Sequence, residues 1–264
     1  VRDDLARASV MALSFVAQSA HGQDSPMVPQ SRVDEGRTIV DRFMIRWRGE
    51  PDPAHVEAID AYFISAAEHG MNASTFTARV IASTGADVAA CLSGAVGAMS
   101  GPLHGGAPSR AQHMIEGVER TGDATKYVKE ALDRKERLMG FGHRVYRAYD
   151  PRAAVLRDTC KRLGAPRYEV ALELEKAAIA ELADRYPERK METNVDYWAA
   201  VLLDFADVPG EMMTPLFVCA RTAGWSAYVL EQKRTGRLIR PSSKYTGPGP
   251  RPITDVHGYD LLPG

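Results

Sequence analysis

The segment GFGHRVYRAYDPR, residues 140–152, carries the side chains of this sequence that are best suited to chemistry. Gly140 and Gly142 let the backbone approach a flat or phosphorylated group closely, because glycine has no Cβ. His143 has a side chain that can transfer protons or polarise a carbonyl near neutral pH. Three arginines in the segment offer planar cationic groups for carboxylates and phosphates: Arg144, Arg147 and Arg152. The segment therefore predicts a site for a small anionic substrate and a phosphorylated carrier.

A second histidine, His104, lies in the glycine-rich segment GPLHGG. Glycines on both sides leave its ring open to a ligand. A lone histidine is more often structural, but a second histidine in a similar setting at position 143 favours a functional role. The sequence has neither an HExxH motif nor a cluster of His and Cys at metal-ligand spacing, so we expect no metal site.

Asp196, in the segment ETNVDYW, lies where a helix is expected to begin. A carboxylate in a first turn stabilises the helix dipole, and this alone would explain its presence. Its apolar neighbours Val195, Tyr197 and Trp198 could also desolvate the carboxylate and raise its basicity. Asp196 would then act as a general base. On the residues alone, both interpretations stay open.

Arg221 lies among apolar residues of a predicted helix, and a buried guanidinium there requires an anionic partner. An internal salt bridge and a bound anion would both satisfy this need. Arg240 lies in a tail rich in Pro and Gly, where a solvated charge is the simplest expectation. His69, Asn72 and Ser74 lie in the segment EHGMNAS, at a junction between two predicted helices. Either Asn72 or Ser74 would cap the helix that follows.

The composition is that of a globular protein, with 264 residues, 45% hydrophobic and 25% charged, and a net charge of -1. Such a chain is long enough for one large domain or two. A charge so close to zero argues against nucleic acid or a membrane surface as partners. No apolar run reaches the ~18 residues of a membrane span. The three cysteines fit no metal spacing, and we expect buried thiols in a cytoplasmic protein.

Helical periodicity runs through most of the chain and predicts an all-α fold. The first helix begins at the N-terminus, with one face formed by Leu5, Ala8, Ala12, Phe15 and Val16. The other helices are expected over residues 53–68, 72–84, 87–100, 108–119, 123–134, 151–163, 168–186 and 195–206, and from Thr214 to about Thr235. Asp52 is expected to cap the first of these, and the last is expected to tolerate Gly224. The helix over 87–100 has small side chains on most faces, which fits the middle of a bundle or a subunit interface.

A polar, charge-rich segment over residues 106–207 lies between the glycine-rich GPLHGG and a Val-Pro-Gly turn. This predicts a small domain of residues 106–207, inserted into a larger domain of residues 1–105 and 208–264. The last part of the larger domain would be an extended tail.

Five motifs, in their order and spacing, resemble the citrate synthase family: GPLHGGA, GFGHRVYRAYDPR, NVDYW, CARTAGW and IRPSSKYTGP. The segment HGMNAST also resembles the HELNAST-type segment of that family. The resemblance covers essentially the whole chain. It implies an all-α homodimer whose large and small domains close over the substrates. It also implies a Claisen-type condensation of oxaloacetate with acetyl-CoA, a co-substrate, followed by hydrolysis of the thioester without any cofactor.

The resemblance also assigns roles to single residues. Asp196 aligns with the base for the acetyl methyl group, His104 with the residue that hydrogen-bonds the thioester carbonyl, and His143 with the residue that polarises the oxaloacetate carbonyl. The implied oxaloacetate ligands are His69, His143, Arg152, Arg221 and, reaching over from the other subunit, Arg240. The implied CoA contacts are Met139, Gly140, Gly142, Arg147 and Asn194, and Ser74 is expected beside His104.

The sequence departs from the family pattern at two places. Gly70 stands where a glutamate usually follows the histidine, which weakens the expectation for His69. In the family, several helices of the large domain precede the helix near which this chain starts. We therefore expect part of the large domain to be absent. Two alternatives stay open. One is 2-methylcitrate synthase, which uses propionyl-CoA, because one methylene changes binding by only ~1–3 kcal/mol. The other is a non-catalytic truncated paralogue or fragment.

Overall fold

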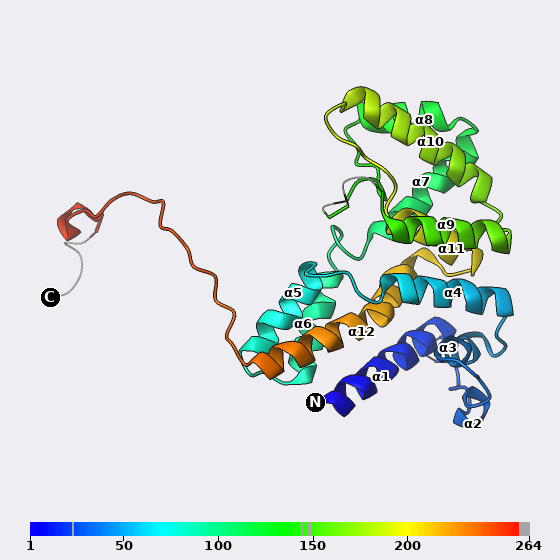
Figure 1. Ribbon diagram of the computed structural model, residues 1–264, viewed down its shortest axis with the longest axis horizontal. Coiled ribbons are helices and arrows are strands. Elements are labelled where there is room, and N and C mark those ends of the chain that lie inside the picture. The colour runs from blue at the N-terminus through cyan, green and yellow to red at the C-terminus, as the bar shows by residue number, and fades with distance from the viewer. Residues whose placement is uncertain (23, 144, 147–148, 259–264) are drawn as a thin grey trace.

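The computed structural model describes residues 1–22, 24–143, 145–146 and 149–258, and helices make up most of it (Figure 1). Within these ranges no strand occurs, and the one β-type pairing is an isolated antiparallel bridge between Phe141 and Thr193. This confirms the all-α prediction. No helix in these ranges is long and apolar enough to cross a bilayer. The helices are α1 (Arg2–His21), α2 (Gln30–Val33), α3 (Ile39–Arg48), α4 (Pro53–Ala66), α5 (Ala73–Ser83), α6 (Val88–Met99), α7 (Ala107–Thr121), α8 (Ala124–Asp133), α9 (Pro151–Leu163), α10 (Tyr168–Arg185), α11 (Val195–Phe205), α12 (Gly210–Thr235) and the 3₁₀ turn η1 (Ile253–Asp255).

Capping residues set the starts of α4 and α5 as the sequence predicts. The Asp52 side chain accepts hydrogen bonds from the backbone N of Ala54 at 2.7 Å and of His55 at 3.3 Å. The Asn72 side chain accepts one from the backbone N of Thr75 at 3.1 Å. These contacts satisfy N–H groups that a helix leaves unpaired in its first turn.

Helix α12 begins at Gly210 rather than at the predicted Thr214, so Pro215 lies inside it. A proline has no N–H and therefore removes one hydrogen bond of the helix. Met213 before it and Leu216 after it are fully buried in the core. Their burial stabilises this segment by about 1.5–3 kcal/mol each, which outweighs the one lost bond.

Two predictions for the N-terminal part were wrong. Helix α3 was not predicted, although Thr38 and Asp41 form a capping box, in which each side chain accepts from the other's backbone N at 3.0 and 2.9 Å. Phe15 does not lie on the buried face of α1, because its side chain is 64% exposed. The buried stripe of α1 runs through Leu5 and Ala17 and faces α3 and α12.

The helices form two groups that meet at α4 and α12. The long α12 packs against α1, α4, α5 and α6 in one group (Figure 1). In the other group, α11 packs against α7 and α9, and α10 packs against α8. Helix α4 contacts α9, α11 and α12, and α12 also packs against α7, so both helices join the two groups. The second group lies within the predicted small domain, residues 106–207, and the division into two domains stays a prediction.

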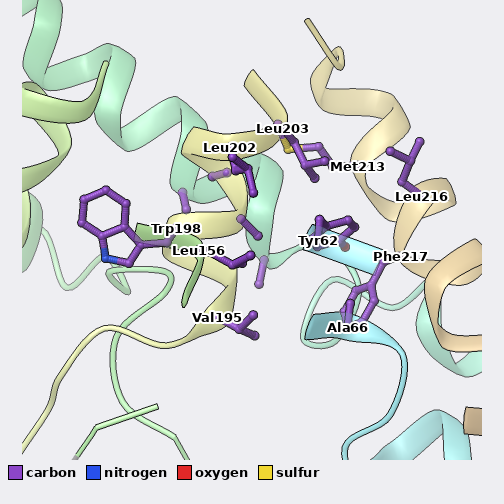
Figure 2. Packing of buried hydrophobic residues seen from close by; sticks show 14 of the residues in the cluster. Tyr62, Ala66, Leu156, Val195, Trp198, Leu202, Leu203, Met213, Leu216 and Phe217 are labelled. Atoms are coloured by element: carbon purple, nitrogen blue, oxygen red, sulfur yellow. The ribbon is translucent and has the colours of Figure 1, made fainter. Parts of the chain in front are cut away.

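A continuous core fills the junction of the two groups (Figure 2). Trp198 and Leu202 of α11 are fully buried there, as are Leu156 of α9, Tyr62 of α4 and Met213 of α12. Interiors of this kind are close-packed and deform little. The first turn of α11 is therefore held firmly against α4 and α9.

Helix α6 lies at the periphery of the molecule, where it packs against α5 and α12. A Cβ on Gly94 would collide with the side chain of Ile81 on α5. Close packing against α5 therefore explains the glycine at this position of α6. The outward residues of α6 are exposed and mostly small: Ala89, Ala90, Ser93 and Gly97, together with the larger Val96. Within one chain this helix is not in the middle of a bundle, so a subunit interface is the predicted setting that is left to test.

Candidate active site

The glycine loop around Gly140 and Gly142 is fastened to the segment before α11. The backbone N of Gly142 donates to Glu192 O at 2.8 Å, and the backbone N of Asn194 donates to Gly140 O at 2.8 Å. The Asn194 side chain donates from Nδ2 to Gly142 O at 2.9 Å. Its Oδ1 accepts from the backbone N of Asp196 at 3.0 Å and caps α11. The glycine loop and the first turn of α11 therefore form one unit.

Gly140 is required by its contact with α11. Its φ of +83° is in the left-handed region, and a Cβ at this position would lie 2.7 Å from the Cβ of Tyr197. The close approach predicted for this glycine is thus to a helix of the same chain.

We expect Gly140→Ala to lower the free energy of unfolding by about 2–4 kcal/mol, because both the backbone conformation and the contact with Tyr197 are lost. Gly164→Ala is a matched control, since Gly164 has φ +70° but a methyl group added there would meet nothing within 4 Å. It should cost only about 1–2 kcal/mol. Urea unfolding of both variants measures the difference, and equal losses would contradict a role for packing at Gly140.

His143 is held as a neutral ring with its proton on Nε2. Its Nδ1 accepts hydrogen bonds from the backbone N of Val145 at 3.0 Å and of Tyr146 at 3.2 Å. Because two N–H groups point at Nδ1, this nitrogen carries no proton. Burial and the positive charge of Arg152 lower the pKa of His143, which keeps the ring neutral at pH 7. Its Nε2–H can therefore donate to a carbonyl oxygen.

Nitrogen-15 NMR of the imidazole rings at pH 7 measures this directly. We expect His143 to be protonated at Nε2 and unprotonated at Nδ1, while the exposed His113 should show the tautomer mixture of a solvated ring. Protonation of His143 at Nδ1 would contradict the assignment.

His104 is connected to a buried hydroxyl at the start of α5. The buried Ser74 Oγ lies 2.8 Å from His104 Nε2 and 2.8 Å from Asn72 Oδ1, and it accepts a hydrogen bond from Trp225 Nε1 at 3.1 Å. The single hydroxyl proton can go to Asn72 or to His104. When it goes to His104 Nε2, the ring proton sits on Nδ1 and can be donated to a ligand oxygen. Burial, aided by Arg221, lowers the pKa of His104 and favours the neutral ring.

Asp196 lies in the first turn of α11, in the same unit as the glycine loop, and is mostly enclosed by protein. Burial raises the pKa of Asp196 to about 6, against the opposing positive charges of Arg152 and Arg221. A carboxylate with this pKa is ionised at pH 7 and is a stronger base than a solvated aspartate. Asp196 therefore has the properties of a general base.

Arg221 projects from α12 with only 2% of its surface exposed. Its Nε donates to Ala66 O at 2.6 Å, and its guanidinium lies 4.8 Å from the centre of the Phe217 ring. No carboxylate within the described ranges forms an ion pair with it. Burial lowers the pKa of Arg221 to about 10, so the group stays charged at neutral pH. A buried cation that forms no ion pair within these ranges indicates a binding site for an anionic ligand. This is the second of the two possibilities that the sequence left open for Arg221.

Arg152 is held differently. Asp150, which is buried, accepts from Arg152 Nε at 3.0 Å and from Nη2 at 2.7 Å, and also from the backbone N of Val195 at 2.9 Å. These hydrogen bonds and the Arg152 charge outweigh burial and lower the pKa of Asp150. Asp150 thus joins the start of α9 to the start of α11, and fixes Arg152 near Asp196.

His69 completes the group. Its ring lies 4.9 Å from that of His143 and 5.4 Å from that of Tyr146, between ring centres. Its Nε2 is buried and has no hydrogen-bond partner within the described ranges. Burial, with the charge of Arg152, lowers the pKa of His69 to about 4. The structure therefore brings His69 beside His143, although Gly70 follows it.

Other predicted site residues are not brought into this group. Arg240 is exposed on the tail, which runs away from the helices (Figure 1). Arg147 lies outside the described residues. Met139 is buried, with its backbone N 3.3 Å from Met114 Sδ, and Asn194 uses its side chain to hold the glycine loop. Within the described ranges, no three His, Cys, Asp or Glu side chains converge on a possible metal position.

Sequence reasoning missed several residues that shape the site: Tyr62, Tyr146, Asp150 and Trp225. Only Asp150 carried a local signal, the Asp-Pro start of a helix. Tyr146 lies only three residues after His143, in a segment without helical periodicity. Tyr62 and Trp225 act across long sequence separations. Trp225 reaches Ser74, for example, from α12 to α5.

Comparisons with known proteins agree with this geometry. The family model described as the citrate synthase C-terminal domain matches residues 2–242. The chain is 68% identical over 261 residues to the protein named "Putative citrate synthase 2" of Mycobacterium tuberculosis, covering 99% of this chain and 70% of that protein. It is 40% identical over 206 residues to the 2-methylcitrate synthase of Shewanella oneidensis, covering 78% of this chain and 54% of that protein.

Among solved structures, the chain is similar to the citrate synthase of Thermoplasma acidophilum, in a ternary complex with carboxymethyl coenzyme A and oxaloacetate. The TM-score is 0.81 at 26% identity, covering 96% of this chain and 69% of that one. The matches in sequence and in fold extend over nearly all of the present chain. The chain therefore belongs to the citrate synthase family, whose enzymes are acyltransferases.

Proposed function

We propose that this chain condenses acetyl-CoA with oxaloacetate and hydrolyses the resulting thioester, which releases citrate and CoA. The observation that carries the proposal is the presence in one site of a basic carboxylate, Asp196, and a buried arginine, Arg221, that forms no ion pair within the described part of the chain. One group can remove a proton, and the other can hold a dicarboxylic acid beside it.

In the first step, Asp196 takes a proton from the methyl group of acetyl-CoA, and the electron pair moves onto the thioester oxygen. Such a proton is far too weakly acidic for a carboxylate unless the developing enolate is stabilised. His104 donates from Nδ1 to this oxygen once Ser74 has turned its hydroxyl proton to His104 Nε2. Ser74 is thus a positioning residue for His104.

In the second step, the enol carbon attacks the ketone carbon of oxaloacetate, and a C–C bond forms. The ketone oxygen becomes an alkoxide, which accepts a hydrogen bond and then a proton from His143 Nε2–H. The proton that Asp196 took from the methyl group passes through solvent to His143, which restores both residues. Water then attacks the thioester carbon of the citryl-CoA, the C–S bond breaks, and CoA leaves with a proton from the water. Every atom is accounted for by the two substrates and water, so the proposal includes no cofactor.

For substrate binding, we assign the oxaloacetate carboxylates to Arg152 and Arg221, with His69 and His143 nearby. The proposed CoA contacts are Met139, Gly140, Gly142, Arg147 and Asn194. The helices of residues 106–207 would then move as a small domain relative to residues 1–105 and 208–264, and close over both substrates. A cytoplasmic location is part of the same proposal.

We also propose a homodimer in which Arg240 of one subunit reaches the site of the other. Two observations support it: the exposed, mostly small-residue face of α6, and the exposure of Arg240 on a tail that runs away from the helices. In a dimer that pairs an Arg221→Met subunit with an Arg240→Ala subunit, both changes would fall on one site and leave the other site intact. If the site is shared, mixing the two inactive variants should restore about a quarter of the activity by random pairing. A mixture that stays inactive after subunit exchange would contradict the shared site.

The acyl substrate is tested by steady-state release of CoA with acetyl-CoA and with propionyl-CoA. We expect a higher kcat/KM for acetyl-CoA. The 2-methylcitrate synthase of Shewanella oneidensis, at 40% identity, makes propionyl-CoA the second candidate. A pocket distinguishes one methylene by only ~1–3 kcal/mol, so activity with both substrates is expected. A higher kcat/KM for propionyl-CoA would replace the first assignment by the second.

A further inference from the structure

Tyr62 carries a buried hydroxyl that no part of the mechanism has used. Its side chain is 2% exposed, and its hydroxyl has no hydrogen-bond partner within the described ranges. A buried tyrosine hydroxyl normally has a partner, because leaving it without one forfeits its hydration. The position of Tyr62 on α4 shows which group could be that partner.

Two contacts place Tyr62 next to Arg221. Ala66 lies one turn after Tyr62 on the same face of α4, and its carbonyl accepts from Arg221 Nε at 2.6 Å. The rings of Tyr62 and Phe217 lie 6.5 Å apart between centres, and the Arg221 guanidinium covers the same Phe217 ring. Figure 2 shows Tyr62, Ala66 and Phe217 together at one side of the core. Tyr62 and Arg221 therefore share one wall of the site.

The charges around Tyr62 agree with this placement. Burial and the negative charge of Asp196 raise its pKa, while the positive charge of Arg221 lowers it. The hydroxyl therefore stays protonated at all physiological pH values and is a permanent donor. The hydroxyl is therefore close enough to both Asp196 and Arg221 for their charges to act on its pKa.

We propose that Tyr62 is a substrate-binding residue whose hydroxyl donates to the oxaloacetate carboxylate held by Arg221. The inference rests on the proposed function. A carboxylate has more acceptor positions than one guanidinium fills, so it can accept from both groups. Binding would then give the buried hydroxyl the partner that the described part of the chain does not supply.

Tyr62→Phe tests this by removing the hydroxyl alone. We expect the Kd of oxaloacetate, measured by titration calorimetry, to rise roughly 10- to 100-fold, as for a hydrogen bond to a charged group. The KM of the acyl-CoA should not change. The Tm of the free protein should stay the same or rise, since the hydroxyl has no partner before oxaloacetate binds. Unchanged oxaloacetate affinity in a folded variant would overturn the proposal.

Tyr197→Phe is the matched control for stability. The buried Tyr197 hydroxyl donates to Ala171 O at 2.6 Å, so its removal should lower Tm, in contrast to Tyr62→Phe. A hydroxyl that serves Asp196 instead would shift the acid limb of the kcat–pH profile while the oxaloacetate Kd stayed constant. That outcome would also overturn the proposal.

A double-mutant cycle with Arg221→Met gives a second measurement. If both groups hold one carboxylate, the losses of oxaloacetate affinity should be less than additive. Additive losses of oxaloacetate affinity would mean that the Tyr62 hydroxyl does not bind the carboxylate held by Arg221, and would overturn the proposal. Wild-type protein that fails to bind oxaloacetate at all would instead overturn the proposed function, and this inference with it.

Discussion

Asp196→Asn should lower kcat for condensation by roughly 10²- to 10⁴-fold, because an amide cannot accept the methyl proton. The affinity for oxaloacetate should persist, since its carboxylates are assigned to arginines and not to Asp196. Stopped assays of CoA release give kcat, and titration calorimetry gives the Kd of oxaloacetate. An equal collapse of both quantities would contradict the role of base.

The same variant should be more stable than the wild type at pH 7. The folded-state pKa of Asp196 is raised to about 6, so ionising it costs folding free energy as pH rises from its ordinary pKa through about 6. Removing the charge should raise the free energy of unfolding by on the order of 1–3 kcal/mol at pH 7 and leave it unchanged at pH 3. Urea unfolding at the two pH values measures this. A variant that is less stable than the wild type at pH 7 would show that burial of the ionised Asp196 carboxylate does not destabilise the folded protein.

Arg221→Met should weaken oxaloacetate binding by about 2–5 kcal/mol, or roughly 30- to 5,000-fold in Kd. The methionine fills similar space but leaves the carboxylate in a buried site without a counter-charge. The free protein should lose little stability, because the lost bond to Ala66 O is offset by removal of an unpaired buried charge.

Arg46→Met is the matched control. Arg46 is also buried, at 7% exposed, but it lies on α3 and donates to Gln30 Oε1 at 2.8 Å. Its loss should leave the Kd of oxaloacetate unchanged. Similar losses of affinity in both variants would mean that Arg221 acts through the fold rather than through a bound anion.

Residues with local signals were predictable from the sequence. The Asp52 and Asn72 caps and the helical periods gave the all-α fold, and the helix bounds of α9 and α11 agree with prediction within a residue. Helix α3 was missed, although Thr38 and Asp41 carry the local signal of a capping box. The start of α12 was misplaced because Pro215 suggested a first turn.

Contacts between distant segments were not predictable. Gly224 looked like a tolerated defect in α12, yet a Cβ there would lie 2.5 Å from Ala67 O, which its own backbone N–H binds at 3.0 Å. That contact fixes the end of α4 beside Arg221. Likewise, Asp150 reads as a helix cap, and only the fold brings it to Val195 N. Such roles depend on which helices pack together, and one sequence does not determine this locally.

The most direct test of the proposed reaction is to measure citrate and CoA together, over a range of pH, with the purified chain, acetyl-CoA and oxaloacetate. We predict one citrate for each CoA released, no release without oxaloacetate, and a rate that falls as pH drops through about 6, where Asp196 becomes protonated. Release of CoA without citrate, or no release from folded protein that binds both substrates, would contradict the proposed reaction.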